Sequence, residues 1–134
     1  RIIPRMKFEH FALNVPDARA HARWLVAQLG FTIVRQQEVA PYIHFLADET
    51  GRVVLEVYTN PIAPVPDYKT RHPLVFHFAV VSADIAADRA RLEKAGAVLF
   101  SEETLADGSR LLIMRDPWGL PLQFCQRANP FPMP

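Results

Sequence analysis

The chain has 134 residues, 50% of them hydrophobic and 22% charged, a composition typical of one globular domain rather than a disordered chain. Its 15 basic and 14 acidic residues give a net charge of +1, so the sequence lacks the electrostatic signature of nucleic-acid binding. A single cysteine excludes an internal disulfide, and no apolar run is long enough to span a membrane. We find no export signal and expect a cytoplasmic protein that contacts neither nucleic acids nor membranes.

The first half of the chain predicts a strand, a helix and three further strands. Asp17 is typical of a helix N-cap, and Gly30 of a left-handed helix end. Alternating and short apolar runs predict the strands. The expected elements are a strand over 7–15, a helix over 17–29, and strands over 31–37, 42–47 and 52–59.

The second half predicts the same order of elements. Asp84 and Gly96 bound its helix, and turn residues separate its strands. The expected elements are a strand over 74–81, a helix over 84–95, and strands over 97–102, 110–115 and 120–127. A proline-rich connector over 60–73 joins the two halves.

An internal repeat explains this agreement, because the sequence matches itself when shifted by 67 residues. Residues 8–12 (FEHFA) then lie over 75–79 (VFHFA), and 55–57 (LEV) lie over 122–124 (LQF). The sequence therefore predicts an α+β fold, with βαβββ modules over 7–59 and 74–127 inside one domain spanning 1–134.

Four polar residues occupy matched positions in the two modules. His10 and His77 share one position in the first strand, and Glu56 and Gln123 share another in the last strand. Repeated modules usually pack about a pseudo-twofold axis, which would bring equivalent positions together. Two imidazoles and a carboxylate are good ligands for a divalent transition metal, and an amide oxygen is a weak fourth. Core histidines and a surface glutamate are the alternative, but the recurrence at matched positions favours a metal site.

Other polar residues have weaker functional signals. His21, His44 and His72 have no matching histidine in the other module, so we interpret them as surface or pocket residues. Cys125 lacks a neighbouring base and is a poor candidate nucleophile. Strand alternation predicts a mainly apolar lining around the four polar positions. The expected lining residues are Phe8, Ala12, Val54, Tyr58, Val75, Ala79, Pro121 and Cys125.

The paired modules resemble the vicinal oxygen chelate superfamily, which includes glyoxalase I, bleomycin and fosfomycin resistance proteins and extradiol dioxygenases. The motifs that carry the resemblance are 8–13 (FEHFAL), 54–57 (VLEV), 75–79 (VFHFA) and 115–122 (RDPWGLPL). The resemblance implies a cupped mixed sheet with a divalent metal (Zn, Ni, Fe or Mn) on its concave face. It assigns His10, Glu56 and His77 as ligands, with Gln123 at the position of a second glutamate in glyoxalase I.

The resemblance to glyoxalase I-like members implies a lyase or isomerase that acts on a small vicinal-oxygen substrate through an enediolate, with Glu56 as ligand and base. Tyr58 and His44 are the next candidates for the base. A metal-free protein that sequesters a small molecule, as some resistance proteins do, is the first alternative. An extradiol-type dioxygenase is the second, disfavoured because its glutamate ligand stands where this chain has Gln123. We also expect a homodimer.

Overall fold

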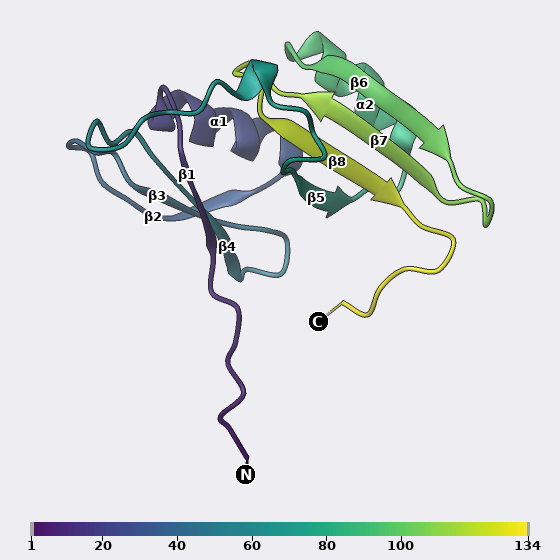
Figure 1. Cartoon of the computed structure of the whole chain (residues 1–134), viewed down its shortest axis with the longest axis horizontal. Coiled ribbons are helices and arrows are strands. Elements are labelled where there is room, and N and C mark those ends of the chain that lie inside the picture. The colour runs from purple at the N-terminus through teal and green to yellow at the C-terminus, as the bar shows by residue number, and fades with distance from the viewer. Residues whose placement is uncertain (1, 134) are drawn as a thin grey trace. The chain divides into compact units, whose positions relative to one another are not determined.

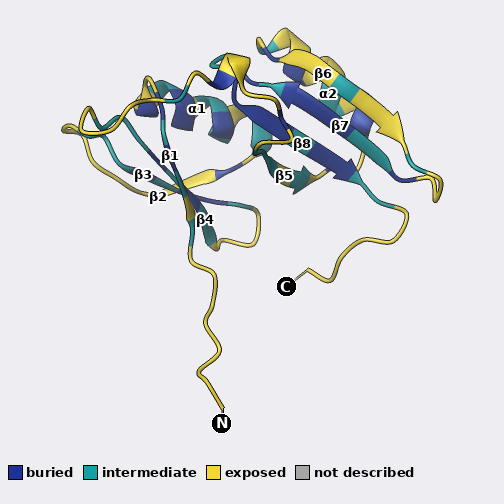
Figure 2. Ribbon diagram, viewed as in Figure 1, coloured by how far each residue is buried: buried dark blue, intermediate teal, exposed yellow. Residues whose placement is uncertain are grey.

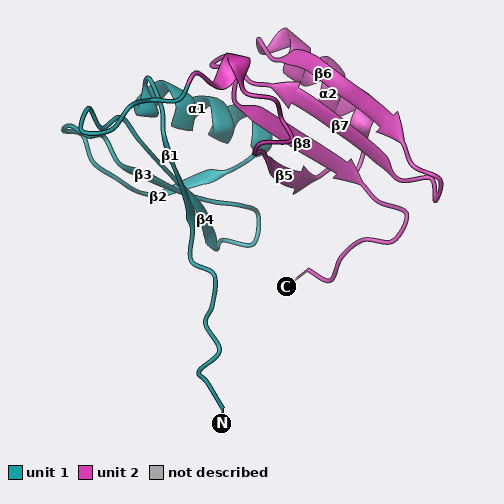
Figure 3. Cartoon of the chain, in the orientation of Figure 1, with its two compact units in different colours: residues 1–66 teal, residues 67–134 magenta. Residues whose placement is uncertain are grey.

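The structure is a computed structural model that describes residues 2–133. It divides into two compact units, Arg1–Pro66 and Asp67–Pro134, called unit 1 and unit 2 below (Figure 3). Each unit contains one helix and one four-stranded mixed sheet. The α+β class with two βαβββ modules is therefore confirmed. None of the helices among residues 2–133 combines the length and apolar character needed to cross a membrane.

Unit 1 follows the predicted order of elements (Figure 1). Its sheet has the order β1-β4-β3-β2, in which β1 and β4 are parallel and the other pairs are antiparallel. The elements are β1 (Phe11–Asn14), α1 (Ala18–Leu29), β2 (Thr32–Gln36), β3 (His44–Ala47) and β4 (Val53–Tyr58).

Unit 2 repeats this topology with the sheet order β5-β8-β7-β6, and β5 and β8 are its parallel pair. A short 3-10 helix, η1 (Tyr68–Thr70), precedes the sheet within the predicted connector. Tyr68 is buried, so this part of the connector belongs to the folded unit. The remaining elements are β5 (Phe78–Val81), α2 (Ile85–Lys94), β6 (Val98–Thr104), β7 (Arg110–Arg115) and β8 (Pro121–Gln126).

The strand register reproduces the repeat found in the sequence. Phe11 pairs with Leu55 in unit 1, and Phe78 pairs with Leu122 in unit 2, so both members keep the 67-residue shift. The second and third strands of each unit depart from this shift by one residue. His44 pairs with Val57, the equivalent of Phe124, and Phe124 pairs with Leu112. The structural counterpart of His44 is therefore Leu112, one residue beyond the position given by the uniform shift.

Both predicted helix starts are confirmed by their capping bonds. The backbone N–H of Ala20 donates to Asp17 Oδ1 over 3.1 Å, and that of Ala87 donates to Asp84 Oδ1 over 3.0 Å. These bonds satisfy donors that the first helical turn leaves without a partner. At the other end of α1, Gly30 has φ 70°, the left-handed conformation expected there.

The helix of unit 1 covers one face of its sheet and creates the core there. Leu25 from α1 and Leu46, Leu55 and Val57 from the strands are buried, with at most 3% of each residue exposed (Figure 2). His21 joins them at 0% exposure, because it lies on the same helical stripe as Leu25.

The interpretation of His21 and His44 as surface or pocket residues is wrong, since both are buried. His44 is 3% exposed and lies opposite the buried Val57. Its Nδ1 donates to the carbonyl oxygen of Tyr42 over 2.7 Å, which satisfies a polar group that would otherwise be costly to bury. His72 is exposed, as predicted.

The first strand of each module is shorter than predicted. Strands were expected from residues 7 and 74, but β1 begins at Phe11 and β5 begins at Phe78. Each is an outer strand with a single hydrogen-bonded neighbour, and the residues before it lie beyond the ladder. His10 and His77 therefore occupy the residue immediately before the strand rather than a position within it.

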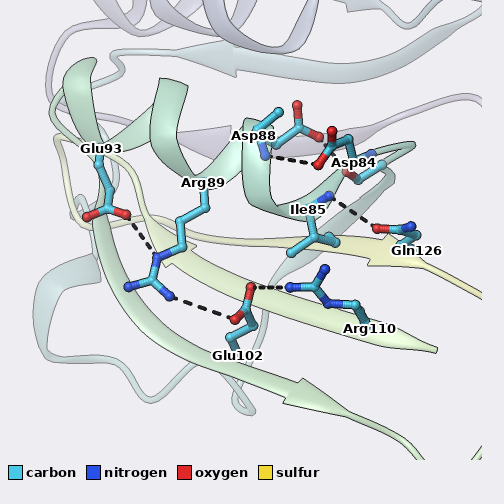
Figure 4. A network of polar contacts seen from close by, with 10 residues as sticks. Asp84, Ile85, Asp88, Arg89, Glu93, Glu102, Arg110 and Gln126 are labelled. Carbon is cyan, nitrogen blue, oxygen red and sulfur yellow. Dashed lines mark hydrogen bonds and ion pairs between the residues drawn. The ribbon is translucent and has the colours of Figure 1, made fainter. Parts of the chain in front are cut away.

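Charged side chains link α2 to the outer strand β6, and β6 to its neighbour β7 (Figure 4). Arg89 Nε donates to Glu93 Oε1 over 2.9 Å, and Arg89 Nη1 lies 3.8 Å from Glu102 Oε2. Arg110 Nη2 donates to Glu102 Oε1 over 3.2 Å. These side chains are partly exposed, so water and salt screen the ion pairs. The ion pairs therefore contribute little to the stability of the fold and serve mainly to orient the side chains between α2 and the strands.

We predict that Gly119→Ala destabilises unit 2 far more than Gly108→Ala does. Both glycines have left-handed backbone, with φ of 89° and 91°, so each substitution carries a conformational cost of about 1–2 kcal/mol. A Cβ on Gly119 would also lie 2.7 Å from the backbone nitrogen of Lys69, whereas nothing lies within 4 Å of one on Gly108. The free energy of unfolding, measured with urea, should therefore fall by about 1–3 kcal/mol more in Gly119→Ala than in Gly108→Ala. Equal losses in the two variants would contradict the close approach.

Candidate functional site

The sheet of unit 1 has a second face that α1 does not cover. Along β4 the buried Leu55 and Val57 alternate with Val54, Glu56 and Tyr58, which are only partly buried. Alternation along a strand places these two sets on opposite faces. We call the face that carries Glu56 the open face of unit 1.

His10 and Glu56 meet on this open face. His10 lies one residue before β1, and its Nε2 is 3.2 Å from Glu56 Oε1. The side chains are 29% and 15% exposed, so both reach solvent while most of their surface is covered. The ring of Phe45, which lies opposite Glu56 on β3, meets the His10 ring edge-on with 5.6 Å between centroids. Two of the four residues predicted to converge, His10 and Glu56, are therefore in contact.

The His10 ring is oriented by a second carboxylate that the sequence analysis missed. Its Nδ1 lies 2.9 Å from Oε1 of Glu9. Glu9 precedes the strand, so period-two alternation does not say which way its side chain points. A carboxylate that accepts from one nitrogen of a histidine leaves the other nitrogen available as a ligand, an arrangement common around metal-binding histidines.

The donor atoms of this pair fit a shared divalent cation. Two ligands bound at about 2.0–2.1 Å are about 2.8–3.4 Å apart when their bonds meet at octahedral or tetrahedral angles. The distance of 3.2 Å between His10 Nε2 and Glu56 Oε1 falls within that interval. A neutral imidazole nitrogen and a carboxylate are also the donor types that transition metals prefer.

His77 and Gln123 occupy the equivalent positions of unit 2. In the parallel pairs, Ala12 lies opposite Glu56 and Ala79 lies opposite Gln123, so each histidine precedes its alanine by two residues. His77 Nδ1 lies 2.8 Å from the carbonyl oxygen of Pro73. Since a carbonyl only accepts, Nδ1 carries the hydrogen, and in the neutral ring Nε2 keeps its lone pair.

The structure thus gives one direct contact among the four predicted ligands, the His10–Glu56 pair. Within residues 2–133 no three histidine, cysteine, aspartate or glutamate side chains form a group that could hold a metal ion. Gln123 Oε1 accepts a weak bond from the Cys125 thiol, with 3.6 Å between oxygen and sulfur. A joint site of all four residues remains a prediction.

The expected apolar lining differs in exposure from residue to residue. Phe8 and Val75 lie ahead of the strands and are 60% and 68% exposed, so they line a face only at its margin. Ala12, Val54 and Tyr58 are partly buried on the open face of unit 1, as an accessible lining requires. In unit 2, Ala79 is exposed, whereas Pro121 and Cys125 are buried.

Equivalent turns lead into the strands that carry Glu56 and Gln123. Both have the pattern Asp-x-x-Gly, at residues 48–51 and 116–119, and end in a glycine with positive φ. Asp116 Oδ1 accepts from the backbone N–H groups of Trp118 and Leu120 over 3.0 and 2.9 Å. Residues 115–122 therefore determine where β8 starts. They contribute to the candidate site by positioning Gln123 on that strand.

The thiol of Cys125 is protonated at neutral pH. Burial raises the pKa of Cys125, and the nearby Arg127 guanidinium, 3.9 Å from the sulfur, only partly offsets that effect. Because the thiolate is the reactive form, this environment agrees with the interpretation of Cys125 as a poor nucleophile.

Comparison with known proteins identifies the family. Residues 7–124 match the Glyoxalase/Bleomycin resistance protein/Dioxygenase superfamily, so the chain belongs to this superfamily. The resemblance inferred from the motifs is therefore confirmed. No curated protein matched the sequence.

Solved structures of different kinds share the fold. An antibiotic binding protein from Streptomyces sp. CB03234, TnmS3, aligns with a TM-score of 0.70 at 18% identity, covering 95% of this chain and all of that one. A glyoxalase family protein from Enterococcus faecalis aligns with a TM-score of 0.67 at 22% identity, covering 90% and 97%. A glyoxalase I mutant from Zea mays aligns with a TM-score of 0.69 at 21% identity, covering 92% of this chain and 46% of that one. At these identities the likeness extends to the fold alone.

We predict that alkylation of Cys125 by iodoacetamide rises with pH and reaches its midpoint above that of a free-cysteine peptide. Burial raises the pKa, so the thiolate fraction at pH 7 is smaller than in the peptide. Arg127→Gln should shift the midpoint higher still, because the guanidinium favours the thiolate, whereas Lys94→Gln on the exposed side of α2 should not shift it. Mass spectrometry reads the single cysteine directly, and a midpoint at or below that of the peptide would contradict this environment.

Proposed function

We propose that the protein binds one divalent transition metal through His10, Glu56, His77 and Gln123 and acts as a glyoxalase-like lyase or isomerase on a small substrate with vicinal oxygens. The observation that carries this proposal is the His10–Glu56 pair, whose donor atoms lie 3.2 Å apart at 29% and 15% exposure. The equivalent register of His77 and Gln123, together with the hydrogen bond from His77 Nδ1 to Pro73 that leaves Nε2 as the ligand atom, supports their assignment as the other two ligands.

The donor set favours an anionic or chelating substrate. One carboxylate and three neutral ligands leave a divalent cation with a net charge near +1. When bound, the cation would supply Lewis acidity to two neighbouring substrate oxygens and so acidify the adjacent C–H. The metal is zinc, nickel, iron or manganese, all of which accept imidazole and carboxylate ligands.

Glu56 is the group we assign to proton transfer. It is the single carboxylate among the four predicted ligands, and it lies on the open face between Val54 and Tyr58. Its carboxylate oxygen would accept the proton from the substrate C–H and return it to the neighbouring carbon. Glu9 and Phe45 hold the His10 ring from two sides, so His10 presents Nε2 toward Glu56 in a fixed direction.

The second candidate function is metal-free sequestration of a small molecule. Gln123 supports it, because an amide replaces the carboxylate that the resemblance to glyoxalase I implies at this position. The likeness of the fold to TnmS3, described as an antibiotic binding protein, is consistent with it. In this case the open face would bind its ligand through Phe45, Val54 and Tyr58 and would catalyse no reaction.

A homodimer remains part of the proposal. The outer strands β2 and β6 each have one hydrogen-bonded neighbour and are mostly exposed, with Val34 at 56% and Val98 at 64%. Exposed apolar edge strands are commonly covered by association with another chain. Twofold pairing is the simplest form of such association.

We predict that His77→Ala lowers metal affinity by about 100-fold or more, because a neutral imidazole is a principal ligand and the Gln123 amide compensates poorly. Gln123→Glu should tighten binding by adding an anionic donor. His72→Ala, which removes an exposed histidine of the same unit, is the control and should retain wild-type affinity. The measurement is the metal-to-protein ratio by mass spectrometry after incubation with zinc, nickel, iron or manganese and gel filtration. Negligible metal in both wild type and His77→Ala would replace this proposal with the metal-free candidate.

We predict that Glu56→Gln retains the fold and much of the bound metal but loses turnover by about 100-fold or more, the scale for removal of a general base. The readout is proton exchange at the carbon beside the carbonyl of a 2-hydroxy ketone or a 2-oxoaldehyde hemithioacetal, followed by NMR in heavy water. Glu49→Gln, in the exposed turn before the same strand, is the control.

Unchanged exchange in a metal-loaded Glu56→Gln variant would show that the base lies elsewhere. Tyr58 is then the next residue to test, because it shares the open face with Glu56. His44, the other reserve candidate, is disfavoured because it is buried and lies opposite Val57 on the helix-covered face.

A further inference from the structure

Unit 1 has an open hollow that the proposed metal ligands do not occupy. Its volume is about 350 Å³, and it lies where the segment before β1 meets the start of β4. The residues that line it are Lys7, Phe8, Glu9, Arg52 and Val53.

Glu9 connects this hollow to the open face. Its side chain lines the hollow, and its Oε1 lies 2.9 Å from Nδ1 of His10, the residue that meets Glu56 on that face. Arg52 directly precedes β4, the strand that carries Glu56. The hollow therefore adjoins the His10–Glu56 pair.

The hollow combines two cations with an apolar lining. Lys7 and Arg52 are both exposed, and among residues 2–133 neither forms an ion pair. The carboxylate in the hollow, Glu9, already pairs with His10 Nδ1 at 2.9 Å. Phe8 and Val53 supply apolar surface beside the charges. Lys7 and Arg52 are therefore available to bind an oxyanion, and the neighbouring apolar side chains could contact an apolar group attached to it.

We propose that Lys7 and Arg52 bind the oxyanion, a carboxylate or a phosphate monoester, of an organic ligand whose apolar part contacts Phe8 and Val53. The inference deepens the proposed function, because Glu9 links the hollow to His10 and the reacting oxygens of such a ligand would lie at the neighbouring His10–Glu56 pair. The substrate class is therefore an elongated organic anion with its charge at the end away from the vicinal oxygens.

The test is binding of phenyl phosphate, with phenol as the neutral analogue, measured by NMR shift perturbation at the Arg52 and Val53 signals in excess chelator. We expect phenyl phosphate to shift these signals and phenol to bind at least about 5-fold more weakly. Arg52→Gln and Lys7→Gln should each weaken phenyl phosphate binding by about 3- to 10-fold, and binding should weaken from about 50 to about 500 mM NaCl. Arg23→Gln on the exposed side of α1 is the matched control and should leave the dissociation constant unchanged.

Two outcomes would overturn the proposal. Equal binding of phenol and phenyl phosphate would show that the charge contributes nothing, and wild-type affinity in both Arg52→Gln and Lys7→Gln would exclude these cations as the anion site. The proposal would also be overturned if phenyl phosphate bound only after metal was added and failed to bind to His77→Ala. That result would show that the anion binds to the metal. Because the chelator arm needs no bound metal, failure of the metal proposal leaves this measurement interpretable.

Discussion

The parallel pairing of the first and last strands of each unit is the constraint on which the candidate site depends. It sets Phe11 against Leu55 and Phe78 against Leu122, and so fixes where the histidine before each first strand lies relative to Glu56 or Gln123. A slip of one residue in this register would turn Glu56 toward the helix and bring Leu55 or Val57 to the open face. The burial of Leu55 and Val57 beneath α1 opposes such a slip, so the same contacts stabilise the core and position Glu56.

The turns before β4 and β8 support this register. Each begins with an aspartate whose side chain accepts backbone N–H bonds and ends with a glycine in the left-handed region. In unit 2 the turn is also tied to the segment before β5, because Arg115 Nη1 donates to the carbonyl oxygens of Tyr68 and Gly119 over 2.9 and 3.3 Å. The residues that identify the superfamily in this stretch thus act by placing strands.

The two units share one arrangement but differ in the side chains around it. Unit 1 keeps the pair suited to a cation, with a carboxylate on each side of the His10 ring. In unit 2 the His77 ring is held by the Pro73 carbonyl, and an amide replaces the carboxylate. Superfamily membership is compatible with either catalysis or sequestration, because fold alone does not select a function. The chemistry of these two pairs therefore decides between the candidate functions.

The sequence by itself determined the repeat, the element order and the helix caps, because these depend on local signals: hydrophobic periodicity, Asp17 and Asp84 at the N-caps, and glycines at the turns. It also marked His10 and Glu56 among four candidate ligands, because both positions recur in the repeat, and the structure shows these two in contact. Tertiary structure alone decided that the first strands begin at Phe11 and Phe78, since strand ends depend on where the neighbouring ladder stops. It also decided that His21 and His44 belong to the core and that Glu9 orients His10, because burial and side-chain direction outside a ladder follow from packing between elements distant in sequence.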